Sequence, residues 1–401
     1  MSFRYPAGVV GAAVTPSGPY QTSTAPGIWS LAGQANFKAQ SLWPTQGSFP
    51  PVELYAVGSN GSGQLGLNNL TYYSSPKQVG ALTTWLTIAT GYRHSLAVKT
   101  DGTLWSWGKN NAGQLGLGDT TDRSSPVQVG TLTTWSAIAG WKQTLAVKTD
   151  GTLWSWGSNA QGQLGLGNTT DYSSPKQVGA LTAWLLVSCG YDFSTAIKTD
   201  GTLWAWGVNN FGNLGSGNLT NYSSPKQIGA LTTWKSLESG HTYTLATQTN
   251  NTLWAWGGGG AGQLGLGTAG GYSSPKQVGA LTTWLTVSAG YQTTFAIKTN
   301  VTMWSWGQGS FGRLAFDTAS FYSSPVQVGS LTNWATVSMG QFVGGAVKTN
   351  GTLWTWGFNS NADGAMGVGN TTNYSSPKQV GALTTWLSVK IGEKHLLALD
   401  G

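Results

Sequence analysis

The sequence predicts an all-β fold: a seven-bladed β-propeller with four-stranded blades, preceded by an extended N-terminal arm with a short helix. A ten-residue phrase at 99–108, Lys-Thr-Asp-Gly-Thr-Leu-Trp-Ser-Trp-Gly, returns about every 50 residues, a period typical of propellers and repeat arrays. Each repeat divides into four strand-sized pieces, which is the content of a propeller blade. The series opens midway through one unit and ends with the missing half, as ring closure requires.

The repeat count gives the number of blades. The third and fourth pieces occur seven times, beginning with a Trp-less copy at 54–58, and the first and second pieces occur seven times, ending at 396–400. We therefore expect residues 385–400 to supply two strands beside 54–58. An open solenoid would have capping repeats at both ends instead, and none is apparent.

The turns and prolines order the pieces within a blade. Asp-Gly or Asn-Gly joins the second piece to the third in four copies, and such pairs favour two-residue hairpin turns. Val301 replaces the glycine in one copy; a β-branched residue is strained at positive φ, so we expect a different turn there. Because proline cannot donate to a ladder, the proline in the fourth piece predicts an outer edge strand.

Alternation along the third piece indicates how the blades pack. Trp105 and Trp107 share one face of their strand, whereas Leu104 and Ser106 share the other, so both faces are largely apolar. A sheet that is buried on both sides needs a neighbour on each side, which a ring of blades provides. We expect the bulky tryptophans to pack against the small Ser or Ala of the next blade.

Composition narrows the class of protein. Only 8% of the 401 residues are charged, and ten of the twenty basic residues are lysines at equivalent repeat positions. Repetition spreads the formal charge of +7 around the body, so we expect no nucleic-acid partner. No apolar run reaches the roughly 18 residues of a membrane span, so we expect no membrane insertion. Cys189, the single cysteine, is predicted to be a small buried residue.

Two domains are expected, 1–50 and 51–401. The first lacks the repeat, begins with a Pro/Gly/Ser/Thr-rich arm, and contains a short helical pattern that ends before Pro44. That pattern is apolar for its length, so it predicts either a plug lying on the propeller or a docking peptide for another protein. The candidate anchoring residues are Ile28, Trp29, Leu31, Phe37, Leu42 and Trp43.

The repeat resembles a known family. Trp-Gly-x-Asn-x-x-Gly-Gln-Leu-Gly occurs at 107–116 and 156–165, and Gly-x-x-His-Ser-Leu-Ala-Val occurs at 91–98. These motifs are similar to those of the regulator of chromosome condensation repeat family, and the resemblance covers 53–401. It implies a seven-bladed β-propeller, in agreement with the repeat count.

The resemblance does not by itself imply the activity of the family's founding member, a guanine-nucleotide exchange factor on chromatin. The family histidine is present only at His94 and His395, and the basic chromatin-binding tail is missing. These two histidines belong to adjacent blades and could be neighbours, but no third ligand spacing supports a metal or catalytic pair. We expect hydrogen-bonding turn residues there, no enzyme activity and no cofactor.

Differences among the copies point to a binding surface. Most of each repeat is nearly invariant, whereas the three residues after the turn glycine vary and are rich in aromatic and polar types. Because each turn has the same place in its blade, these residues should share one face of the ring, where a partner would bind; relaxed drift in exposed loops is the alternative. The candidates are Tyr92, Arg93, His94, Trp141, Lys142, Tyr191, Asp192, Phe193, His241, Tyr243, Tyr291, Phe342, Lys394 and His395.

A second resemblance concerns residues 25–44, which look like segments of structural and tail-fibre proteins of marine bacteriophages. It favours a virion structural protein, made in the host cytoplasm and present in several copies per particle. Residues 1–50 would then bind other virion proteins, while the propeller decorates the capsid or tail or adheres to a host-surface glycan or protein. The alternative is a cellular protein–protein interaction scaffold of the same repeat family.

Overall fold

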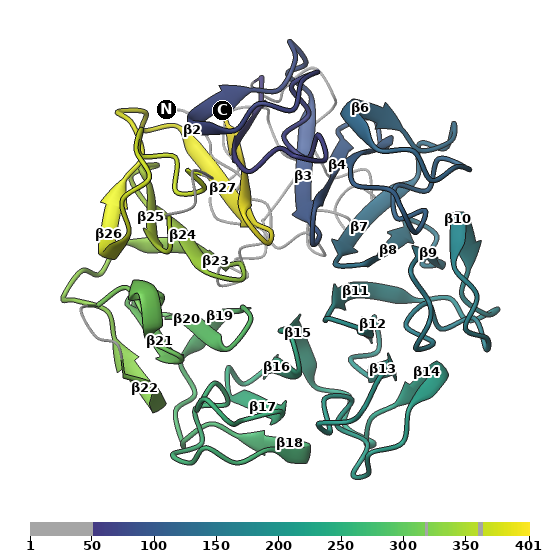
Figure 1. Ribbon diagram of the computed structural model, residues 1–401. Helices are drawn as coiled ribbons and strands as arrows, with labels where there is room; N and C mark the ends of the chain where they lie inside the picture. Colours follow the sequence, from purple (N-terminus) through teal and green to yellow (C-terminus); the bar gives the residue numbers. More distant parts are fainter. Residues whose placement is uncertain (1–50, 317–319, 360–363) are drawn as a thin grey trace, which may run out of the picture.

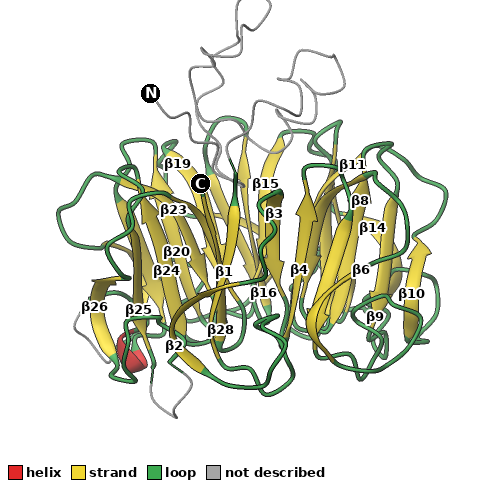
Figure 2. Ribbon diagram, turned by 90° about the horizontal axis from the view of Figure 1, so that it is seen from above, coloured by secondary structure: helices red, strands yellow, loops and turns green. Residues whose placement is uncertain are grey.

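The computed structural model describes residues 51–316, 320–359 and 364–401. Seven four-stranded antiparallel sheets stand around one axis, so the predicted seven-bladed propeller is confirmed (Figure 1). The strands run between the two ends of the ring, where the turns and loops lie (Figure 2). The arm and helix predicted in residues 1–50, with the boundary at residue 50, lie outside the described residues.

The four strands of each blade follow the order of the chain from the axis outward, except where the ring closes. The innermost strands are β3 (Trp85–Thr90), β7 (Trp135–Gly140), β11 (Trp184–Cys189), β15 (Trp234–Ser239), β19 (Trp284–Ala289), β23 (Trp334–Met339) and β27 (Trp386–Ile391). The second strands are β4 (His94–Lys99), β8 (Gln143–Lys148), β12 (Phe193–Lys198), β16 (Tyr243–Gln248), β20 (Thr293–Lys298), β24 (Val343–Lys348) and β28 (His395–Asp400).

The third strands contain the repeated tryptophans: β5 (Leu104–Gly108), β9 (Leu153–Gly157), β13 (Leu203–Gly207), β17 (Leu253–Gly257), β21 (Met303–Gly307), β25 (Leu353–Gly357) and the Trp-less β1 (Glu53–Gly58). The outer strands, with the prolines, are β6 (Arg123–Gln128), β10 (Tyr172–Gln177), β14 (Tyr222–Gln227), β18 (Tyr272–Gln277), β22 (Tyr322–Gln327), β26 (Tyr374–Gln379) and β2 (Tyr73–Gln78). The short 3-10 helix η2 (Ser310–Gly312) follows β21.

One blade, the closing blade, is built from both ends of the repeat region. β28 pairs antiparallel with β1 in a continuous register from Glu53 opposite Asp400 to Gly58 opposite His395. β27 flanks this pair on the axial side and β2 on the outer side, so the purple and yellow strands of Figure 1 share one sheet. The predicted ring closure is therefore confirmed.

In six of the seven blades, the second tryptophan of the repeated phrase joins the blade to the preceding one. Trp107 is fully buried, and its Nε1 donates to the carbonyl of Gln64 at 2.9 Å. A Cβ added to Gly66 would lie 2.8 Å from Trp107 Nε1, so the indole packs closely against this glycine, and it shares a buried cluster with Ala56, which has the position expected for a small residue in the adjacent blade. The same bond recurs from Trp156 to Gln114 (3.0 Å), Trp206 to Gln163 (2.9 Å), Trp256 to Asn213 (3.0 Å), Trp306 to Gln263 (2.9 Å) and Trp356 to Arg313 (3.2 Å).

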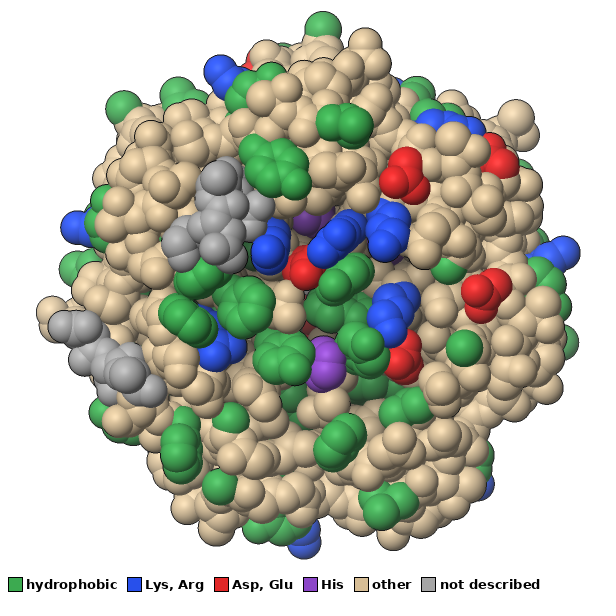
Figure 3. Space-filling view, viewed as in Figure 1, with side chains coloured by type: hydrophobic (Ala, Val, Ile, Leu, Met, Phe, Trp, Pro, Cys, Tyr) green, Lys and Arg blue, Asp and Glu red, His purple; other side chains and the backbone are tan. Residues whose placement is uncertain are grey.

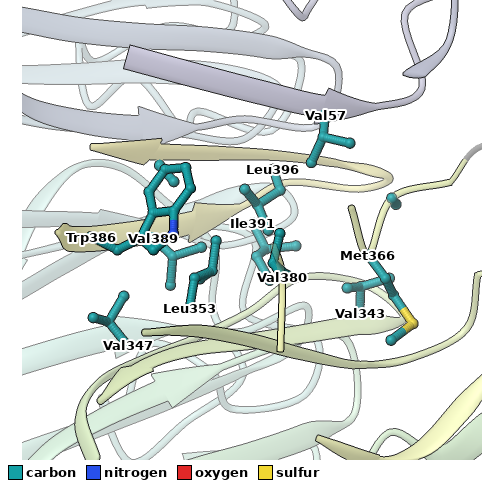
Figure 4. Packing of buried hydrophobic residues seen from close by; sticks show 12 residues of the cluster. Val57, Val343, Val347, Leu353, Met366, Val380, Trp386, Val389, Ile391 and Leu396 are labelled. Atoms are coloured by element: carbon teal, nitrogen blue, oxygen red, sulfur yellow. The ribbon is translucent and has the colours of Figure 1, made fainter. Parts of the chain in front are cut away.

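The seventh interface, between the closing blade and the blade of β23 to β26, lacks the indole-to-carbonyl bond. Val57 of β1 takes the place of the second tryptophan and has no indole to donate. It belongs to a buried cluster with Met366, Val380, Leu396 and Val343, which lie on both sides of this interface (Figure 4). Hydrophobic contact therefore takes the place of the indole-to-carbonyl bond at this interface.

Five of the repeated lysines are held between aromatic rings. The ammonium of Lys99 lies 3.8 Å from the ring centroid of Trp105 and 5.2 Å from that of Trp85, and the residue is only 7% exposed. This is a cation–π geometry, and burial lowers the pKa of Lys99. The equivalent residues Lys148, Lys198, Lys298 and Lys348 lie 3.5 to 4.6 Å from their third-strand tryptophans.

One turn prediction is wrong. Val301 has a φ of 56° and donates its N–H to the Lys298 carbonyl at 2.8 Å, as Gly102 donates to Lys99 at 2.9 Å. The turn is thus unchanged despite the β-branched residue. Asn300 Oδ1 accepts from Thr302 Oγ1 at 2.7 Å, and the strand pairing on both sides imposes the same backbone path, so the chain tolerates the local strain.

Two smaller expectations concern Cys189 and membrane spans. Cys189 is 7% exposed and lies in the hydrophobic core, which confirms the prediction, and burial raises the pKa of its thiol. In the described part of the chain, no helix has the length and apolar character needed to cross a membrane.

Candidate binding face

The turns that join the first and second strands of all blades meet around the axis at one end of the ring. Backbone hydrogen bonds link neighbouring turns: Tyr92 N donates to Trp141 O at 2.9 Å, and Tyr191 N donates to His241 O at 3.4 Å. Figure 3 shows this end, where charged and apolar side chains gather around the centre. We call the following residues the central face: Tyr92, Arg93, Trp141, Lys142, Tyr191, Asp192, His241, Tyr291, Phe342, Glu393 and Lys394.

Aromatic rings form a continuous row across the central face. His241 lies between Tyr191 and Tyr291, with centroid distances of 4.3 and 4.2 Å. The row extends on both sides, from Tyr92 to Trp141 (5.9 Å), from Trp141 to Tyr191 (6.5 Å) and from Tyr291 to Phe342 (6.5 Å). These rings contact one another, which limits their motion. All of them are partly exposed, so a partner can reach them.

Two ion pairs connect turns of adjacent blades on the same surface. Arg93 Nε lies 2.8 Å from Glu393 Oε2, and Lys142 Nζ lies 3.3 Å from Asp192 Oδ1. The Lys142 ammonium also lies 3.6 Å from the ring centroid of Tyr191. Burial raises the pKa of Asp192, against the effect of the Lys142 charge. Burial and the same charge lower the pKa of His241 to about 4, so this imidazole is neutral near pH 7.

Four of the predicted surface residues lie instead in the interior. His94, Tyr243 and His395 are 0% exposed and Phe193 is 1% exposed. Each is the first residue of a second strand, where alternation turns the side chain into the space between blades. The prediction that they contact a partner at the surface is therefore corrected: direct contact is open only to the other ten candidates.

The two buried histidines bind hydroxyls of the following blade. His94 Nε2 lies 3.1 Å from Thr144 Oγ1, which itself donates to the Gln114 carbonyl, so His94 is the donor of the pair. His395 Nε2 has the same relation to Ser95 Oγ at 3.1 Å. Burial lowers the pKa of His94 to about 3 and that of His395 to about 4. Among the described residues, no group of three or more His, Cys, Asp or Glu is placed to hold a metal ion.

The structure adds residues that the sequence did not single out. Phe358 lies 5.9 Å from Phe342 and 4.9 Å from Phe311, so the aromatic row continues onto the loops after β21 and β25. The Arg313 guanidinium lies 5.4 Å from the Phe342 centroid, and burial lowers its pKa to about 10. The sequence does mark Arg313, because most other repeats have a glutamine at this position. The candidate anchoring residues of 1–50 lie outside the described residues.

This fold and face define the class of protein, a closed propeller with a variable surface around its axis. The chain belongs to the regulator of chromosome condensation (RCC1) repeat family. Its repeat model matches residues 53–98, 101–147, 150–197, 200–247, 250–297 and 350–399, and a second model of the repeat matches 86–114 and 185–213.

Solved structures with the same fold include the yeast RCC1 protein Prp20 bound to Kap60, which is 19% identical, with 87% of this chain and 89% of that chain covered and a TM-score of 0.79. Prp20p of Saccharomyces cerevisiae, in a structure reported with its binding to Gsp1p and histones, is 20% identical (87% and 91% covered, TM-score 0.79). Human WBSCR16 is 19% identical (88% and 99% covered, TM-score 0.78). A comparison with curated protein sequences finds no match.

Proposed function

We propose that this protein is a non-enzymatic interaction scaffold that binds another protein through its central face. The observation that supports the proposal most is the position of the sequence differences. The repeats are nearly identical in the third and outer strands, whereas they differ at the turns between the first and second strands, which assemble into one partly exposed surface, and at the loops after the third strands. Aromatic residues and arginine, which dominate protein-binding hot spots, are concentrated there.

The central face is also preorganised. Its turns are joined by backbone hydrogen bonds, its rings contact each other, and its carboxylates are paired with cations of neighbouring blades. A partner would therefore order few side chains on this surface when it binds, which lowers the entropic cost of association. Paired carboxylates and buried, neutral histidines suit recognition better than proton transfer.

The structural relatives agree with a protein partner. Prp20 is described in complex with Kap60 and in relation to Gsp1p and histones. At about 20% identity these names support only the class of ligand for this chain, a protein, and not the particular partner.

The virion hypothesis receives no support from these comparisons. It depends on residues 25–44, which lie outside the described residues, whereas the family matches and the fold neighbours favour the cellular scaffold. Deleting residues 1–50 separates the two hypotheses. A virion component should lose incorporation into particles, and a cellular scaffold should keep its partners.

The proposal is tested by quantitative co-purification from cells that express the gene. Trp141→Ala with Tyr92→Ala alters the central face, and Tyr72→Ala with Tyr322→Ala is the matched control, because these tyrosines are 43% and 36% exposed outside it. We expect at least one protein to be retained by the wild type and the control and to be reduced tenfold or more by the central-face variant. Equal recovery of every partner with all three proteins would refute the proposal.

A further inference from the structure

One loop differs from its counterparts by having almost no side chains. In most repeats an asparagine after the third strand braces the connection between the third and outer strands: Asn110 Oδ1 accepts from Leu115 N at 2.9 Å, and its Nδ2 donates to Asp119 O at 3.0 Å. The loop after β17 has Gly258, Gly259 and Gly260 instead. The opening beside these glycines is wider than the equivalent one in the preceding blade, where a pocket beside Val208 and Asn210 has a volume of about 230 Å³.

The opening is a groove of about 720 Å³ between the loops after β13 and β17, on the same end of the ring as the central face. Its volume lies within the range of small-molecule sites. Phe211, which is 55% exposed, forms one wall, and His241 and Tyr291 of the aromatic row form another. The lining also contains Gln263 and Gln292 and no Asp, Glu, Lys or Arg.

Gln263 has an unused donor in this groove. The residue is 2% exposed, and its Oε1 accepts from Ala261 N at 2.9 Å. Within the described residues, its side-chain nitrogen has no hydrogen-bond partner, although Gln114 Nε2 donates to Asn111 Oδ1 at 3.3 Å in another blade. The residue equivalent to Asn111 is Gly260. Gln263 Nε2 is open to solvent in the groove, so a ligand oxygen at this place would accept a hydrogen bond from it.

We propose that this groove binds a neutral saccharide. Aromatic rings pack against the apolar faces of sugars, and amide side chains both donate and accept hydrogen bonds, as sugar hydroxyls do. The lining has no formal charge to pair with an acidic or basic ligand, since His241 is neutral above its lowered pKa of about 4. A proline-rich peptide would also contact aromatic rings, but it has few hydroxyls to match the amides of Gln263 and Gln292.

This site is separate from the residues altered in the test of protein binding, so the two proposals fail independently. Purified full-length protein is titrated calorimetrically with maltotriose, cellotriose, chitotriose, mannotriose and N-acetyllactosamine, each up to about 10 mM because weak specific ligands have millimolar Kd. An oligoproline peptide is the competing probe. We expect at least one saccharide, and not the peptide, to bind with a stoichiometry of one.

Two variants locate the binding. Gly260→Asn introduces the asparagine that two other repeats have at this position, Asn111 and Asn210; no atom lies within 4 Å of an added Cβ, so the variant should fold, occupy the groove and pair with Gln263. Phe211→Ala removes the exposed wall, and Phe311→Ala, 53% exposed on a neighbouring loop, is the control. We expect affinity to fall at least tenfold in the first two and less than twofold in the control. Binding of the peptide alone, no binding to the wild type, or unchanged affinity in Gly260→Asn would overturn the proposal.

Discussion

Arg93 Nε lies 2.8 Å from Glu393 Oε2, so an ion pair joins residues 300 positions apart in the sequence. Arg93 is in the turn between β3 and β4, and Glu393 is in the turn between β27 and β28 of the closing blade. The pair therefore depends on ring closure and lies on the central face, which relates the closed fold directly to the proposed binding surface.

A double-mutant cycle should detect this pair. Arg93→Met and Glu393→Gln are each expected to lower the free energy of unfolding, with a coupling energy of about 0.5–1 kcal/mol, because the arginine is partly exposed and screened by solvent. Urea unfolding at low ionic strength measures it, and added salt should reduce it. Strict additivity of the two changes would show that the pair does not form.

Replacing the second tryptophan of the phrase, which donates to the preceding blade, should lower the free energy of unfolding more than replacing the partly exposed first tryptophan. Trp107→Phe removes a fully buried N–H and leaves a cavity, so we expect a loss of about 2 kcal/mol. Trp105→Phe, the matched change two residues earlier, should cost less than half as much. Equal losses in denaturant unfolding would mean that the contact with Gln64 does not hold the blades together.

Val301 offers a stabilising change. Glycine adopts positive φ without the steric cost that a β-branched residue incurs, so Val301→Gly should raise the free energy of unfolding by about 1 kcal/mol. Gly102→Val is the reverse control: an added Cβ would clash with the Thr133 carbonyl, so it should destabilise the protein. A stabilising effect of Gly102→Val, or a destabilising effect of Val301→Gly, contradicts the account of this turn.

The buried histidines predict an acid-dependent stability. Their pKa falls from 6.5 to about 3 for His94 and about 4 for His395, so the unfolded chain binds more protons than the folded one below pH 6.5. Stability is complete above pH 6.5 and falls as the pH drops toward 4, by up to about 1.4 kcal/mol per pH unit for each histidine. Unfolding measured across this range checks the slope.

A natural substitution supplies the control for that measurement. Gln143 occupies the position equivalent to His94, and its Nε2 reaches Ser194 Oγ at 3.3 Å. His94→Gln with His395→Gln should therefore keep the fold and reduce the slope between pH 6.5 and 4. An unchanged slope would assign the acid sensitivity to other groups.

Much of the architecture was predictable because the same sequence pattern recurs in nearly every blade. The half-repeat at each end predicted the pairing of β1 with β28, and the prolines predicted the outer strands. The common end for the variable turns followed from repetition alone. The burial of the family histidines could not be predicted from the sequence. The direction of the His94 side chain depends on whether the strand begins at that residue or one residue later.

Other features required the third dimension. The enclosure of Lys99 involves tryptophans from two different strands, and no spacing along one strand predicts it. The turn at Val301 was predicted from local strain, but the surrounding strands determine it. In the sequence, the groove at Gly258–Gly260 is marked only by the absence of side chains. The structure shows that Phe211 of the preceding blade forms one of its walls.

The central claim is that partners bind the assembled turns at one end of the ring. Hydroxyl-radical footprinting of the full-length protein, alone and with a co-purifying partner, tests this most directly. We predict protection at Tyr92, Trp141, Tyr191 and Tyr291, with no change in the outer strands. Protection confined to the outer strands, or to the opposite end around the turns at 100–103 and 149–152, would contradict the claim.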